Sequence, residues 1–91
     1  MTTIDLWVEI DGNRVAQAVH EAGEKLDSAG GDIYLDFSAV RRVDPSALQA
    51  MEELAAVADE KSVKVVLRGV NVDVYKVLKL ARLASRFSIV N

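Results

Sequence analysis

The chain has 91 residues, no cysteine and a formal net charge of −3, and 51% of its residues are hydrophobic. This length and composition predict a single globular domain, residues 1–91, with one core. The absence of cysteine excludes disulfides, thiolate metal sites and a cysteine nucleophile, and it fits a reducing compartment. With His20 as the single histidine, a zinc site built on several imidazoles is excluded as well. We therefore expect neither a metal nor another cofactor.

We expect neither a secretory signal nor a membrane span. The first ten residues lack a basic region and carry Asp5 and Glu9 within their apolar stretch. No segment approaches the roughly 20 apolar residues that a transmembrane helix needs. A cytoplasmic location is the expectation that follows.

The first half of the chain predicts a strand, a helix and a second strand. Apolar and polar residues alternate over residues 4–10, which predicts a half-buried strand with Trp7 on its polar side. Apolar residues then recur at helical spacing over residues 14–28, and we expect Gly30 and Gly31 to cap that helix. The strongly apolar residues 32–37 predict a second strand near the centre of the sheet.

The second half continues the alternation. An alanine-rich apolar face predicts a helix over residues 46–61, and a β-branched run predicts a strand over residues 63–67. We expect Asn71 to cap a third helix over residues 72–84, and residues 87–90 to form the last strand. The order βαβαβαβ with short connections predicts a small α/β domain with parallel strand pairs and right-handed crossovers.

Charge is distributed unevenly along the chain. Residues 1–60 hold four basic and thirteen acidic side chains, a net charge of −9, whereas residues 61–91 hold seven basic and one acidic, a net charge of +6. The asymmetry indicates either neighbouring elements that neutralise each other or two faces for different partners, and it would allow a homodimer. Nucleic-acid binding is disfavoured, because basic and aromatic residues are few and the total charge is negative.

A helix start at residues 43–48 is the sharpest local feature. Asp44 is suited to accept the amide hydrogen of Ser46 or Ala47 as the N-cap, and Pro45 suits the first helical position. One interpretation is simply a well-formed helix start. The other is that Ser46 accepts a phosphate, since a phosphate there would meet free amide hydrogens and the positive end of the helix dipole.

Catalysis is not expected. A hydrolytic triad could be drawn from Ser46, His20 and either Asp36 or Asp44, but the chain has no nucleophile-elbow or oxyanion motif. We expect His20 to be an ordinary residue on the polar border of the first helix, and Asp36 to cap a loop.

Basic residues line the predicted third helix. Lys76, Lys79 and Arg82 recur every three residues, and Arg86 follows them. They form either a solvated face that complements the helix carboxyl end or a docking surface for an acidic partner.

Three segments together resemble the STAS domain of anti-sigma factor antagonists. The first, from Tyr34 to Leu48 (YLDFSAVRRVDPSAL), is similar to a strand ending in an Asp-hydrophobic-Ser turn and then to the Asp-Ser-Ser-Gly-Leu-like motif that opens a helix. The others, LRGVN at residues 67–71 and VYKVLKLARL at residues 74–83, are also similar to the small STAS subunit of bacterial phospholipid-trafficking ABC transporters. The order and spacing of these segments carry the resemblance.

The resemblance implies a STAS fold and function by protein binding without catalysis. Pro45 stands where phosphorylated antagonists carry the acceptor hydroxyl, so a switch would have to move to Ser46, and Ala47 replaces the usual glycine. The implied partner is an anti-sigma factor kinase or, alternatively, the ATPase of an ABC transporter. The residues expected to contact it surround the helix start: Asp44, Pro45, Ser46, Leu48, Gln49 and Glu52.

Overall fold

The computed structural model describes residues 5–28 and 31–90 and contains the predicted order of strands and helices. Ile4 and Gly30, which the sequence placed in a strand and at a helix end, lie outside the described residues. The elements are β1 (Leu6–Glu9), α1 (Val15–Glu24), the 3₁₀ turn η1 (Lys25–Ser28), β2 (Ile33–Asp36), α2 (Pro45–Lys61), β3 (Val65–Arg68), α3 (Val72–Leu80), the 3₁₀ turn η2 (Ala84–Arg86) and β4 (Ser88–Val90).

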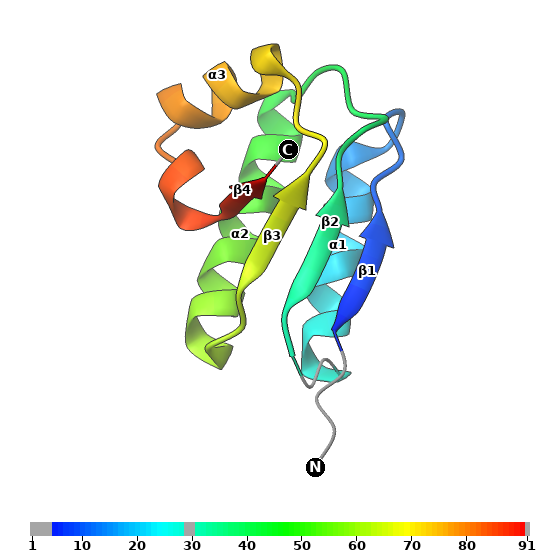
Figure 1. Cartoon of the computed structure of the whole chain (residues 1–91), viewed down its shortest axis with the longest axis vertical. Helices are drawn as coiled ribbons and strands as arrows, with labels where there is room; N and C mark the ends of the chain where they lie inside the picture. The colour runs from blue at the N-terminus through cyan, green and yellow to red at the C-terminus, as the bar shows by residue number, and fades with distance from the viewer. Residues whose placement is uncertain (1–4, 29–30, 91) are drawn as a thin grey trace.

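The strands form one parallel sheet in the order β1-β2-β3-β4, with β2 in an inner position as predicted. In Figure 1 all four strands run upward and the sheet grows from right to left while α1 and α2 lie behind it. The connections through α1 and α2 each leave the top of an upward strand, pass behind the sheet and return one strand to the left. Both crossovers are therefore right-handed, as the sequence predicted. All carboxyl ends of the strands therefore meet at one edge, which α3 adjoins.

The core lies between the sheet and the pair α1 and α2. Strand residues alternate across the sheet, so Ile33 and Leu35 of β2 share the inner face with Val65 and Leu67 of β3, and all four are buried. Five small or flexible residues of the helices cover them and let the helices approach the sheet closely: Val19, Ala22, Ala47, Met51 and Ala55.

The outer face of the sheet carries an aromatic pair. Trp7 is 55% exposed and stacks on Tyr34 with the ring centroids 5.6 Å apart. The guanidinium of Arg68 lies 5.3 Å from the centroid of the Trp7 ring, a cation–π contact. The outward position of Trp7 confirms the half-buried strand that its alternation predicted.

Two predicted helix ends are wrong. The first helix ends at Glu24 and gives way to η1, which places Leu26 in the core; Gly31 lies in a bend and does not cap it. The third helix ends at Leu80, because Arg82 takes a left-handed conformation with φ +61°. The amide of Leu83 then donates to the carbonyl of Leu78 at 2.8 Å, a Schellman closure that buries Leu83.

Candidate functional site

Helix α2 starts as its sequence predicts. Asp44 is the N-cap in extended conformation, and its Oδ1 accepts the backbone amide of Ala47 at 2.8 Å. Pro45 takes the first helical position, where a missing amide hydrogen costs nothing. The carbonyl of Asp44 accepts the amide of Leu48 at 3.0 Å, so the carboxylate and the backbone carbonyl of Asp44 both accept hydrogen bonds from the first turn. Ser46 lies in that turn with its side chain exposed.

Hydrogen bonds join the loop before α2 to the end of β2, to Arg68 at the end of β3 and to the cap of α3. Asp36 Oδ1 accepts the backbone amide of Ser38 at 2.9 Å, which confirms Asp36 as a loop cap. Val40 is buried, and its carbonyl accepts the side-chain amide of Asn71 at 3.1 Å. Asn71 also caps α3, because its Oδ1 accepts the amide of Val74 at 2.7 Å. One side chain thus fixes the α3 start to the loop that leads into α2.

Hydrogen bonding at this loop lowers the pKa of Asp36. The backbone amide of Ser38 contributes most and its hydroxyl adds a second hydrogen bond. Burial opposes these two effects, and the positive charge of Arg68 makes the smallest contribution, also toward a lower pKa. The carboxylate is therefore the favoured form in the folded state.

The predicted contact residues form a surface at the start of α2. We define the partner face as the six residues Asp44, Pro45, Ser46, Leu48, Gln49 and Glu52. All are exposed except Leu48, which is half-buried and packs on the core. Asp44, Leu48 and Glu52 recur every four residues along one side of the helix, Pro45 and Gln49 flank this row, and Ser46 lies farther round the first turn. The structure thus groups these residues on one rigid helix start.

The neighbouring loops add two charged residues that were not among the predicted contacts. Arg41 and Arg42 are exposed and line a shallow hollow of about 520 Å³ together with Asp11 and Gly12 of the β1–α1 loop. The only signal for them in the sequence is their position directly before the helix start. They place positive charge beside the partner face, which itself carries Asp44 and Glu52.

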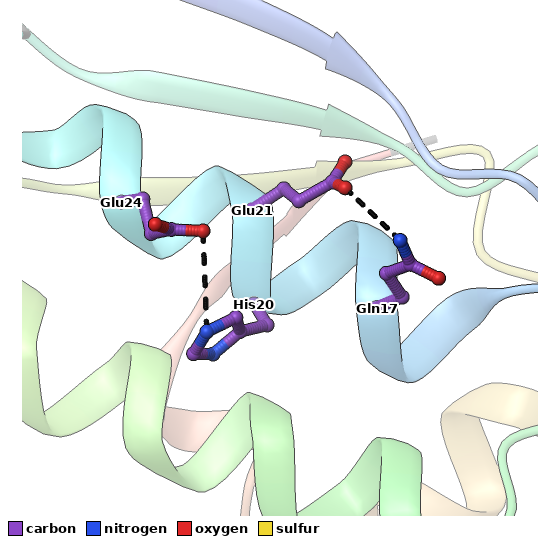
Figure 2. A network of polar contacts seen from close by, with 4 residues as sticks. All are labelled: Gln17, His20, Glu21 and Glu24. Carbon is purple, nitrogen blue, oxygen red and sulfur yellow. Dashed lines mark hydrogen bonds and ion pairs between the residues drawn. The ribbon is translucent and has the colours of Figure 1, made fainter.

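The residues of the hypothetical triad do not come together. Figure 2 shows His20 on α1 beside Glu24, with Nε2 3.9 Å from Oε1, and Gln17 donating to Glu21 at 3.2 Å one turn earlier. Within the described part of the chain no hydrogen bond joins His20 to Ser46 or to either aspartate. In the same residues, no three His, Asp or Glu side chains are grouped as metal ligands.

A family model described as "Mlab, STAS domain" matches residues 2–90. Two solved structures share the fold. One is a sulfate transporter family protein from Wolinella succinogenes, with a TM-score of 0.76 and 16% identity, covering 98% of this chain and 80% of the other. The other is a protein titled an anti-sigma factor antagonist from Thermotoga maritima, with a TM-score of 0.69 and 20% identity, covering 96% and 73%. Among curated proteins, none matches significantly.

Proposed function

The chain belongs to the STAS domain family, and from this premise we propose that it acts in the cytoplasm without catalysis, by binding another protein through the partner face. One observation carries the proposal. Asp44 caps the first turn of α2 and the half-buried Leu48 packs that turn on the core, while Pro45, Ser46 and Gln49 face solvent. A preorganised surface of this kind loses little conformational freedom when a partner binds.

The first candidate is regulation of the anti-sigma factor antagonist type, with an anti-sigma factor kinase as partner. The solved structure titled an anti-sigma factor antagonist supports it, as does a hydroxyl in the first turn of α2. A phosphate on Ser46 would add about −1.5 to −2 charges without breaking the helix, because it would lie at the positive end of the helix dipole. Pro45, however, stands directly after Asp44, where phosphorylated antagonists carry the acceptor hydroxyl. We therefore propose that partner binding is controlled without phosphorylation of Ser46.

The second candidate is a small subunit of a phospholipid-transporting ABC transporter that docks on the ATPase. The description of the matching family model favours it, and so does Pro45, since docking on an ATPase requires the surface but no phosphate acceptor. The segment Leu67–Asn71 ends β3 and caps α3, and it is one of the segments that resemble such subunits. Among the described residues, none of the helices has the length and apolar composition of a membrane span.

Affinity capture from the native cells tests the proposal. Wild type and Ser46→Asp are used in parallel, and captured proteins are identified by mass spectrometry. Aspartate at the helix start is compatible with the dipole, so the variant should fold. The matched control is Ser62→Asp, which adds the same charge about 24 Å away at the other end of α2.

Each candidate predicts a distinct capture. A histidine-kinase-like anti-sigma factor that is lost with Ser46→Asp but kept with Ser62→Asp supports the first. An ABC ATPase with its permease, weakened by the same variant, supports the second. If Ser46→Asp and Ser62→Asp change the amount of captured partner equally, the result contradicts binding through the partner face.

A further inference from the structure

The basic residues of α3 are not neutralised by the acidic half of the chain. Arg86 alone among the four predicted basic positions forms an ion pair, with Asp59 of α2 at 2.9 Å. The side chains of Lys76, Lys79 and Arg82 have no hydrogen bond or ion pair within residues 5–28 and 31–90. Neighbouring elements therefore leave three cations on and just after α3 without a counter-charge.

The same side of α3 exposes apolar side chains. Val72 is 68% exposed and Tyr75 41%, so two large hydrophobic side chains of α3 are open to solvent. Val72, Tyr75 and Lys79 recur at intervals of three and four residues, so they lie along one stripe of the helix. This stripe places apolar side chains at its beginning and a cation near its end.

A trough runs between this stripe and the η2–β4 segment, which lies beside α3 in Figure 1. One hollow of about 500 Å³ is lined by Val72, Tyr75, Ala84 and Ile89. A second hollow of about 490 Å³ shares Tyr75 and Ala84 and adds Lys79 and Arg82. We call the two together the α3–β4 trough; it has an apolar end and a cationic end.

We infer that the α3–β4 trough docks a short acidic segment of a partner protein, one that also carries an apolar side chain. The apolar side chain would cover Val72 and Ile89, and the carboxylates would lie against Lys79 and Arg82. Charge complementarity selects this occupant, because the two cations have no counter-charge among the described residues and carboxylates supply it. A concave trough suits a peptide segment, whereas a flat bilayer would touch only its rim. The inference is independent of the partner face.

A random library of twelve-residue peptides, displayed on phage and selected against the wild type, tests the inference. Enriched peptides should combine at least three Asp or Glu with an apolar residue. Titrated into isotopically labelled protein, they should shift the backbone amide signals of residues 72–89 and leave those of the partner face unchanged. Peptides with lysine in place of each acidic residue should not bind.

The double variant K79Q/R82Q should raise the Kd of these peptides about three- to tenfold, since exposed charge pairs are individually weak. The matched control R14Q/K64Q removes the same charge at exposed positions outside the trough and should leave the Kd unchanged. Val72→Ser should also weaken binding, and circular dichroism shows whether each variant is folded.

Several results would overturn the inference. These are a selection without acidic sequences, peptide shifts centred on the partner face, or equal loss in both double variants. Binding to phosphatidylserine vesicles alone would assign the cations to a membrane, and self-association lost in K79Q/R82Q without peptide binding would assign them to a second copy. Capture that Ser46→Asp and Ser62→Asp change equally would count against the partner face and leave this inference untouched, so the failures of the two proposals are distinguishable.

Discussion

Replacing Gly12 by alanine should destabilise the protein, because the loop that follows β1 lies directly against the loop that precedes α2. A Cβ atom on Gly12 would lie 2.1 Å from the carbonyl oxygen of Ala39, a backbone atom that no side-chain rotation can move. An ordinary carbon–oxygen contact is about 3.3 Å, so the loops would have to separate by about 1 Å. Overpacking of this kind typically costs about 1–3 kcal/mol.

Gly23 provides the matched control, since the same substitution there should stabilise. It lies in α1, and a Cβ would meet Leu54 Cδ1 at 3.6 Å, an ordinary contact. Alanine is favoured over glycine inside a helix by about 0.5–1 kcal/mol.

Thermal unfolding measures both effects. In a domain of this size 1 kcal/mol corresponds to about 4–8 °C. Gly12→Ala should therefore lower the Tm by about 4–24 °C, and Gly23→Ala should raise it by about 2–8 °C. A Gly12→Ala protein as stable as the wild type would refute the close packing of the two loops, and a destabilised Gly23→Ala would refute the described packing of α1 on α2.

Four further outcomes follow from the structure. Ser62→Gly should raise the free energy of unfolding by about 0.5–1 kcal/mol in urea titration, because Ser62 ends α2 in the left-handed region with φ 56°; no gain would contradict that conformation. Asp44→Ala should lower the free energy of unfolding by about 1 kcal/mol, because the N-cap hydrogen bond to Ala47 is lost. An unchanged free energy would show that this cap contributes nothing to stability. Folding lowers the pKa of Asp36, so its carboxylate stabilises the fold fully above the ordinary pKa of 3.8, and this contribution is lost as pH falls through the lower folded-state pKa. Asp36→Asn should therefore flatten the acid side of the curve of unfolding free energy against pH. An unaltered acid side would refute the lowered pKa of Asp36. Incubation with a purified partner kinase should leave Ser46 unmodified because Pro45 holds the acceptor position, and stoichiometric phosphoserine in the mass spectrum would overturn this.

Local patterns in the sequence were sufficient to predict the elements and the α2 start. Alternation around Trp7, the apolar run before Asp36 and the pairing of Asp44 with Pro45 each act within a few residues, and each was confirmed. The end of α3 was not predictable in this way. Arg82 takes the conformation usually supplied by glycine or asparagine, because burial of Leu83 requires the chain to turn there.

Long-range contacts explain what the sequence could not reveal. The α3–β4 trough joins Tyr75 to Ile89 across a turn whose position depends on Arg82, so the spacing of residues along α3 alone gives no sign of it. Nor does the sequence show that Asn71, expected only as a helix cap, also binds the carbonyl of Val40. That bond fixes the loop preceding the partner face.

Site-specific photo-crosslinking in the native cells tests the central claim, protein binding through the partner face, most directly. A benzophenone amino acid at Gln49 should form a covalent adduct with one protein, identified by mass spectrometry. The control position is Glu60, which is exposed on the same side of α2 about 16 Å away, because eleven residues make almost whole turns. An adduct at Gln49 and none at Glu60 is the predicted result. Adducts to the same protein from both positions, or from Glu60 alone, would contradict binding through the partner face.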